Sequence, residues 1–314
     1  MSDPDNWERK TLEKLAFSAL QEQRRARQWG ILFKVLTFSY LFILLFLFTG
    51  WFNHGDGPVG GKHTALIEMH GVIASHGEVS AEKVIGGLQD AFKDKNTKGV
   101  ILRINSPGGS PVQAGYIYDE IKRLRALYPA IPVYAVVEDI CASGGYYVAA
   151  AADRIYVDKA SIVGSIGVLM DGFGFTGTMD KLGVERRLLT AGENKGFLDP
   201  FSPVSAKQKE FAQGMLKEIH QQFIQAVRQG RGKRLKETPE MFSGLFWSGE
   251  TSIAMGLSDA LGSTEYVARE VIKAEDIVDF TLQEGFAERF AKRFGAAMMS
   301  ANPLAQAGAG VTLK

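Results

Sequence analysis

Histidine and cysteine are scarce in this sequence. A single cysteine, Cys141, occurs among 314 residues, so no disulfide can form within the chain. We expect this cysteine to be a small buried residue rather than a nucleophile. CxxC and HExxH motifs are absent, and the five histidines (His54, His63, His70, His76 and His220) lack the spacing of metal ligands. We therefore expect no metal site and no cofactor.

The absence of histidine between positions 77 and 219 matters for catalysis. A serine nucleophile needs a base, and that base is usually histidine. A catalytic serine in the middle of this chain would have to use another residue.

Excess charge of either sign is also absent. The 36 lysines and arginines are balanced by 35 aspartates and glutamates, which gives a formal net charge of +1. This balance does not indicate a nucleic-acid partner or an acidic substrate.

One segment lacks charge almost entirely. Residues 29–52 contain Lys34 as their only charged residue. At a rise of about 1.5 Å per residue, a helix of this length spans about 36 Å, more than the roughly 30 Å hydrocarbon core of a bilayer. Trp29 and Trp51 lie near the two ends, where indole rings favour the membrane interface. We interpret 29–52 as a transmembrane helix and not as a core helix, because soluble helices rarely lack a polar face over this length.

The flanks of this segment predict its orientation. Arg24, Arg25 and Arg27 precede it, whereas 53–61 contains no lysine or arginine. The positive-inside rule then places 1–28, expected to be a short helix that continues into the anchor, in the cytoplasm. A cleaved leader is the alternative, but the apolar run is long for one and no small-residue cleavage site follows. We expect a single-pass anchor in the bacterial cytoplasmic (inner) membrane, with the rest of the chain in the periplasm.

Beyond the anchor, the composition divides the chain into three parts. Glycine and proline mark 53–63 as a flexible linker. In 64–275, strand-like runs alternate with helix patterns, which predicts an α/β domain with helices packed on a largely parallel sheet. In 276–314, a phenylalanine-containing amphipathic segment precedes a low-complexity tail; core packing, docking on a neighbouring subunit and membrane-surface binding remain open for it. The expected strands are 64–73, 99–104, 132–137, 154–157 and 184–189, and the expected helices are 81–92, 111–127, one that opens at 144, and 205–228.

Two glycine-rich turns each lie between an expected strand and an expected helix. In NSPGGS (105–110), the glycines allow the backbone to approach a ligand closely. In CASGGYY (141–147), Ser143 begins a helix at the carboxyl edge of the sheet, where the active sites of α/β proteins lie. An oxyanion at this serine would find the amide of Gly144, with the amide of Gly109 as the second donor. The alternatives are a plain tight turn at the first motif and an ordinary N-cap serine at the second.

Lysine can replace histidine as the base of a serine nucleophile, and the chain offers Lys195 in AGENKGFLDPF. An unperturbed lysine has a pKa of about 10.4, so the role needs desolvation to lower it. Phe197, Leu198 and Phe201 can exclude water nearby, whereas Asp199 would raise the lysine pKa if the two formed a pair. An exposed loop lysine is the alternative.

Taken together, NSPGGS, ASGGYYVAAAAD, VGSIGV (163–168) and the lysine loop resemble the signal peptide peptidase A family of serine proteases, in particular its half-length, membrane-anchored members. NSPGG alone is shared with the proteolytic subunit of Clp protease and the wider crotonase-like superfamily. The resemblance implies a crotonase- or Clp-protease-like domain. It also implies a role for each motif residue: Ser143 as nucleophile, Lys195 as general base, Gly109 and Gly144 as oxyanion-hole donors, and Ser165 as the serine whose hydroxyl hydrogen-bonds the lysine.

The resemblance also implies a homo-oligomer, a ring or dome, with active sites completed across subunit boundaries. The substrates it implies are remnant signal peptides and other extended hydrophobic segments. His220, on the expected long helix, is structural in this interpretation. The sequence thus predicts a membrane-anchored serine endopeptidase with a Ser–Lys dyad. The alternatives are a non-catalytic crotonase-like scaffold that binds membrane peptides, and acyl-CoA chemistry, which an external location disfavours because coenzyme A is cytoplasmic.

Overall fold

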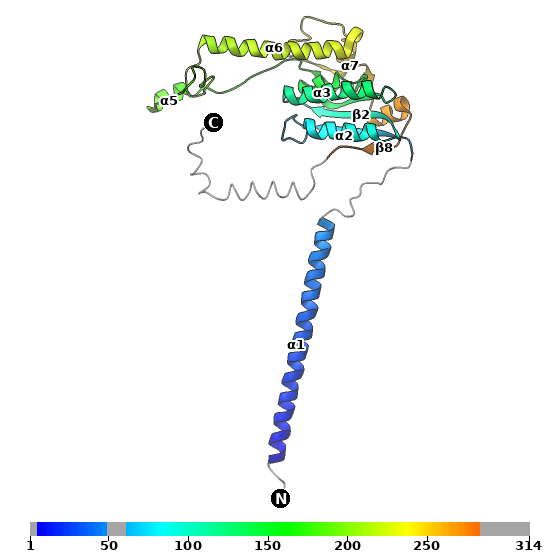
Figure 1. Ribbon diagram of the computed structural model, residues 1–314, viewed down its shortest axis with the longest axis vertical. Coiled ribbons are helices and arrows are strands. Elements are labelled where there is room, and N and C mark those ends of the chain that lie inside the picture. The colour runs from blue at the N-terminus through cyan, green and yellow to red at the C-terminus, as the bar shows by residue number, and fades with distance from the viewer. Residues whose placement is uncertain (1–4, 49–60, 283–314) are drawn as a thin grey trace. The chain divides into compact units, whose positions relative to one another are not determined.

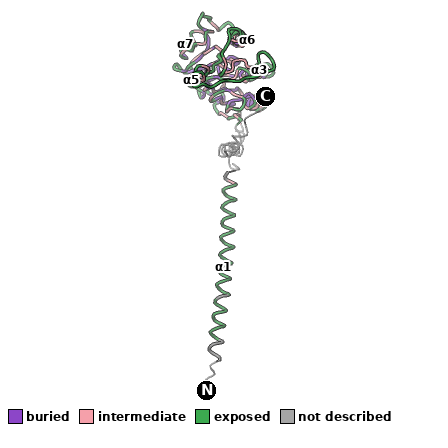
Figure 2. Tube along the Cα trace, turned by 90° about the vertical axis from the view of Figure 1, so that its left-hand side faces the viewer, coloured by how far each residue is buried: buried purple, intermediate pink, exposed green. Residues whose placement is uncertain are grey.

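The computed structural model describes residues 5–48 and 61–282. They fall into two units, one with the helix α1 (Asp5–Phe48) and one with the sheet and the other helices (Figure 1). As the sequence predicts, the polar residues before position 29 and the apolar run that follows share one continuous helix of 44 residues. Within the described part of the chain, α1 is the one helix long and apolar enough to cross a membrane. The side chains that the structure describes between Lys10 and Leu45 are exposed (Figure 2), which fits an anchor whose apolar surface meets lipid.

The second unit is built on an eight-stranded sheet with the order β6-β5-β3-β2-β1-β8, in which β4 pairs with β3 and with β7. All pairings are parallel except the antiparallel one between β5 and β6. The strands are β1 (His63–His70), β2 (Thr97–Ser106), β3 (Val133–Ala142), β4 (Arg154–Val157), β5 (Ile162–Gly164), β6 (Phe246–Ser248), β7 (Ala260–Leu261) and β8 (Ile277–Asp279).

Helices cover this sheet, so that its central strands are buried on both faces. Successive residues point to opposite faces: Ile67 and Leu102 enter the larger core cluster, whereas Leu66 and Ile101 enter a smaller cluster on the other side. This burial explains why the central strands read as continuous apolar runs. The helices are α2 (Ala81–Lys93), α3 (Pro111–Leu127), α4 (Gly144–Ala149), α5 (Thr176–Leu182), α6 (Ala206–Arg231), η1 (Gly232–Arg234), α7 (Gly249–Ala254), α8 (Thr264–Tyr266) and η2 (Val267–Ile272).

Local capping signals position three of these helices where the sequence predicts them. Ser80 caps α2 through its side chain, and Ser110 caps α3, which has Pro111 in its first turn. Ser205 and Gln208 form a reciprocal capping box at the start of α6. These side chains satisfy backbone N–H groups that the helix itself leaves without an acceptor.

Two strand predictions need correction. Residues 184–189 are not a strand; they lie exposed between α5 and α6 and pair with no strand of the described sheet. β3 runs to Ala142 and not to 137, because its last residues pair with β5 after its middle residues pair with β4. The sheet also includes β8, which pairs with β1 beyond the expected domain end at 275. The predicted amphipathic segment at 283–314 lies outside the described residues.

Candidate active site

Ser143 lies between the end of β3 and the start of α4 in an unusual backbone conformation. Its φ is 51° and its ψ is −123°, a region that non-glycine residues rarely adopt and that is concentrated at functional sites. Its amide donates to the carbonyl of Gly164 (2.9 Å). Although Ser143 occupies the N-cap position of α4, its side chain makes no capping hydrogen bond. The N-cap alternative is therefore wrong, and the hydroxyl is not committed to the helix.

The two glycine-rich turns are in direct contact beside this serine. A Cβ on Gly108 would lie 2.7 Å from the Cβ of Ser143 and 2.7 Å from the amide nitrogen of Gly144. A Cβ on Gly144 would lie 3.3 Å from the amide nitrogen of Gly109. The first motif is thus more than a tight turn: its glycines allow the backbone to approach the serine closely.

The loop at Ile73 holds the first turn in place. The amide of Ile73 donates to the carbonyl of Gly108, and the amide of Ser110 donates to the carbonyl of Ile73, both at 2.8 Å. Gly109 has a φ of 147°, and a Cβ there would overlap the Ile73 carbonyl oxygen. Among the described residues, neither the Gly109 nor the Gly144 amide has an acceptor. Both amides therefore remain available to an anion beside Ser143.

A cleft of about 670 Å³ opens at this junction. Ser143, Gly109, Gly144 and Ser165 all border it, so the fold brings together four of the five site residues that the sequence predicts. Most of the other lining residues are apolar or small: Pro107, Pro111, Val112, Tyr147, Gly167, Val168, Leu169, Ile219, Gln222, Phe223, Ser243 and Gly244. Such a lining suits an apolar, extended ligand with few polar side chains.

Tyr147 also borders the cleft, a position that no motif in the sequence indicates. It follows Ser143 by one helical turn and stacks on Phe223 of α6, with ring centroids 4.9 Å apart. Burial raises the pKa of its hydroxyl, so Tyr147 is neutral near pH 7 and does not act as the base. Phe223 belongs to the apolar face of α6, which the sequence pattern shows, but neither Ser243 nor Gly244 has a comparable signal.

Ser165 follows β5 and, like Ser143, has a positive φ, which is also 51°. Its amide donates to the carbonyl of Leu245 (2.7 Å). The next residue is held by α6, because Nε2 of His220 lies 3.0 Å from the carbonyl oxygen of Ile166. His220 thus fixes one wall of the cleft and lies outside its lining, in agreement with the structural role expected for it.

Lys195 is the site residue that a single chain does not bring to the cleft. It is exposed and lies in a series of turns between α5 and α6. In Figure 1, α5 and the connection to α6 project beyond the sheet. Within the described residues its ammonium has no ion-pair partner. Asp199 does not pair with it: its carboxylate lies 3.5 Å from Nε of Arg186 and accepts a hydrogen bond from Ser202 (2.6 Å).

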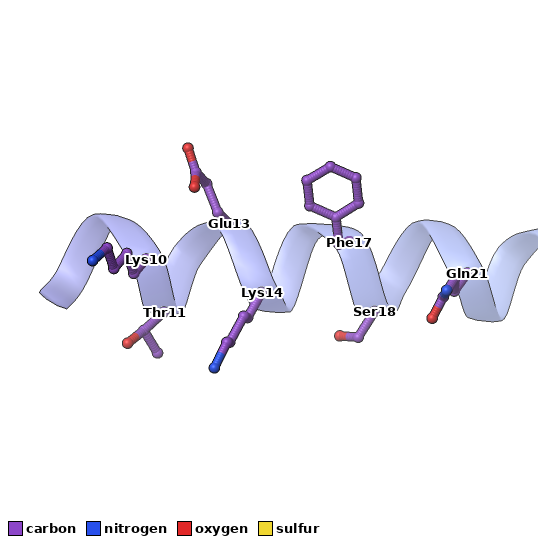
Figure 3. Close-up of a pocket in the computed structure, with 7 residues that line it drawn as sticks. All are labelled: Lys10, Thr11, Glu13, Lys14, Phe17, Ser18 and Gln21. Carbon is purple, nitrogen blue, oxygen red and sulfur yellow. The ribbon is translucent and has the colours of Figure 1, made fainter. Parts of the chain in front are cut away.

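The remaining polar groups do not suggest a second reactive centre. Cys141 is fully buried, and burial raises the pKa of its thiol, as expected for a structural cysteine. In the described ranges, no group of three His, Cys, Asp or Glu side chains is placed to hold a metal ion. A shallow hollow on α1 (Figure 3) is bordered by one exposed helix alone and has no opposing wall; its residues are Lys10, Thr11, Glu13, Lys14, Phe17, Ser18 and Gln21.

Comparison with known proteins adds an independent observation. The family model described as Peptidase family S49 matches residues 125–278, which contain Ser143, Ser165 and Lys195. A candidate protease of Methanocaldococcus jannaschii is 35% identical over 209 residues, 65% of this chain and 66% of that protein. Protease 4 of Haemophilus influenzae is 30% identical over 220 residues, 68% of this chain and 35% of that protein.

One further relative is named as a transporter and not as a protease. The Na(+)/H(+) antiporter NhaA of Brucella melitensis biotype 1 is 45% identical over 202 residues, 63% of this chain but 27% of that protein. The chain therefore covers about a quarter of that relative, and most of the protein that carries the antiporter name lies outside the match.

Proposed function

Because the chain belongs to peptidase family S49, the signal peptide peptidase A family of serine proteases, we propose that it is a membrane-anchored endopeptidase that uses Ser143 as its nucleophile and Lys195 as its base. One observation carries the proposal. Ser143 has a rare backbone conformation, its side chain makes no capping hydrogen bond, and it lies beside two glycine amides that have no acceptor among the described residues.

The proposed reaction is acyl transfer in two steps. Neutral Lys195 takes the hydroxyl proton of Ser143 while Oγ forms a bond to the scissile carbonyl carbon. The amides of Gly109 and Gly144 stabilise the oxyanion that results. As the C–N bond breaks, the lysine returns the proton to the leaving amine, and an acyl-enzyme remains. Water, deprotonated by the same lysine, then hydrolyses this ester and frees the serine.

We propose that Lys195 acts in the cleft of a neighbouring copy of the chain. Its exposure and its absence from the lining of the cleft support this arrangement. The exposed segment 169–204, which includes α5 and Lys195, also exposes large apolar side chains, among them Phe173 (81% exposed) and Leu189 (95% exposed). Burial of these side chains would favour contact with another subunit. Ser165, at the rim of the cleft, would then hydrogen-bond the incoming lysine and orient it.

The proposed substrates are extended hydrophobic peptides, including remnant signal peptides. The apolar lining of the cleft supports this class, and so does the anchor, which would hold the enzyme where such peptides are released. The arginines before the anchor support a cytoplasmic N-terminus and a catalytic unit on the outer face of the cytoplasmic membrane. In this proposal, residues 53–63 serve as the linker and 64–275 hold the peptidase.

Mixing two inactive variants of the full-length chain tests the shared site. Ser143→Ala and Lys195→Ala are each expected to lose hydrolysis of a fluorogenic hydrophobic peptide. When they are assembled together, the intact serine of one copy meets the intact lysine of another, and part of the activity should return. Full activity of Lys195→Ala alone would refute the lysine as base. Two inactive variants that stay inactive when mixed would refute the sharing between copies.

A further inference from the structure

The carboxylates close to Lys195 in sequence differ in how strongly they are paired with cations. Two carboxylates lie near it in sequence, Glu193 and Asp199, and each is paired with a different cation. Glu193 pairs with Lys207 of α6 at 3.3 Å, but both side chains are about four-fifths exposed, and such pairs are weak and screened. The pair between Asp199 and Arg186 is more enclosed, because the side chain of Asp199 is only 13% exposed.

Arg186 makes more than one contact in this segment. Its guanidinium carbon lies 5.8 Å from the centre of the Phe201 ring, and that ring stacks on Phe175, with centroids 5.4 Å apart. Ser202 donates a hydrogen bond to the same carboxylate oxygen of Asp199 that faces Arg186. These contacts lower the pKa of Asp199, the Ser202 hydrogen bond most and the Arg186 charge as well, so the carboxylate stays ionised.

An unpaired Asp199 would be within reach of Lys195. Hydrogen bonds from Lys195 to Gly192 and from Asp199 to Gly196 form successive three-residue turns along this stretch. The turn closed by the Asp199 amide keeps the Cα atoms of Gly196 and Asp199 within about 7 Å of each other, and Lys195 precedes Gly196 by one Cα–Cα step of about 3.8 Å. The Cα atoms of Lys195 and Asp199 are therefore at most about 11 Å apart, a distance that the two extended side chains can span. An ion pair there would favour the ammonium form and oppose proton transfer.

We propose that Arg186 is a positioning residue that withholds Asp199 from Lys195 and so leaves the lysine free to accept the proton of the serine. This inference rests on the proposed role of Lys195. Arg186 itself touches no reacting atom. Its effect is exerted through Asp199, which it holds by charge.

The test is the pH dependence of kcat/KM for hydrolysis of a fluorogenic hydrophobic peptide by the full-length chain. If neutral Lys195 is the base, kcat/KM rises with pH as the lysine loses its proton, and this rise is the alkaline-rising limb of the profile. In Arg186→Met, which keeps much of the side-chain volume, the limb should move to a pH about half a unit to one unit higher. At a given pH on the limb, activity should then be roughly threefold to tenfold lower. Arg186→Lys keeps the charge and should retain the position of the limb. Arg187→Met is the matched control, since the neighbouring Arg187 pairs with exposed Glu185 (3.1 Å) and is expected to change nothing.

The double variant Arg186→Met with Asp199→Asn separates withholding from a general loss of structure. Removal of the carboxylate should return the limb towards its wild-type position. The inference is overturned if Arg186→Met lowers activity equally at all pH values, or if the double variant keeps the shift of the single one. Lys195→Ala separates the failure of the proposed base from the failure of the proposed role of Arg186. If Lys195→Ala remains active, Lys195 is not the base. If Lys195→Ala is inactive but Arg186→Met has an unshifted pH profile, only the role of Arg186 is refuted.

Discussion

Substitution of Gly109 by alanine should disable the oxyanion site without removing any functional side chain. Gly109 has a φ of 147°, which side chains other than glycine rarely adopt, and this strain costs about 1–3 kcal/mol. The added methyl would overlap the carbonyl oxygen of Ile73 and lie 2.9 Å from the backbone nitrogen and carbonyl carbon of that residue. The backbone has to shift, and the Gly109 amide shifts with it. Loss of one oxyanion donor lowers kcat by about 100- to 1000-fold.

The assay for Gly109→Ala is kcat on a hydrophobic peptide, with thermal unfolding measured in parallel. Two alanine variants at other glycines serve as controls that separate backbone strain from collision of the added methyl. Gly71 has a φ of 100° and open space around it, so Gly71→Ala has the backbone strain without the collision. Gly115 lies within α3 with nothing near its Cβ position, so Gly115→Ala should stabilise the chain slightly and leave kcat unchanged. A folded Gly109→Ala protein with kcat within about twofold of wild type, a change of only about 0.4 kcal/mol in the barrier, would refute the oxyanion assignment.

Three further predictions concern residues outside the lining of the cleft. Buried Cys141, whose thiol pKa is raised by burial, should react with a water-soluble maleimide only after denaturation; rapid labelling of the folded chain would contradict its burial. His220→Leu removes the donor to the Ile166 carbonyl and should lower kcat about fivefold, whereas His220→Gln keeps an N–H donor and should lose less; equal losses would argue against this hydrogen bond. Burial raises the pKa of Asp259, but the hydrogen bond and the charge of Arg231 outweigh burial, so the pKa is lower than the ordinary value of 3.8. The ionised carboxylate therefore stabilises the fold above that pH, and this contribution is lost as the pH falls through the pKa of the folded state. In urea unfolding, the free energy of unfolding of Asp259→Asn should decline less steeply in acid than that of the wild type.

The parts of the fold that the sequence predicts well are those with local causes. Ser80, Ser110 and Ser205 cap the helices that follow them, and a cap needs only the next few residues. The extension of β3 to Ala142 has a distant cause, because its last residues are held by β5, which lies some 20 residues further along the chain. The segment 184–189 has strand-like residues but no partner strand in the described sheet, and the pattern of a single sequence does not show whether a strand lies beside a segment.

The contrast between local and distant causes also explains which site residues the sequence predicts. Ser143, Gly109 and Gly144 stand in turns that directly follow strands, so their convergence at one edge of a parallel sheet follows from the alternation of elements. Ile219 and Phe223 line the cleft because α6 packs across it, and the pattern of α6 shows only that these residues face an apolar surface. That Asp199 is paired with Arg186 depends on how the exposed segment folds back on itself, and no spacing in the sequence indicates it.

The proposed active site combines a buried part and an exposed part. Ser143 and the two proposed oxyanion glycines lie where β3, α4 and the turn at Ile73 meet, whereas Lys195 lies on an exposed segment and, in this proposal, acts in another copy of the chain. Activity should therefore depend on the concentration of chains, because dilution removes the lysine without unfolding the site. In detergent, kcat/KM per chain is expected to fall on dilution while the unfolding temperature of the catalytic unit changes less. Activity per chain that stays constant down to concentrations at which light scattering detects only single chains would place a sufficient base within each chain, and would assign the exposed segment a role other than catalysis.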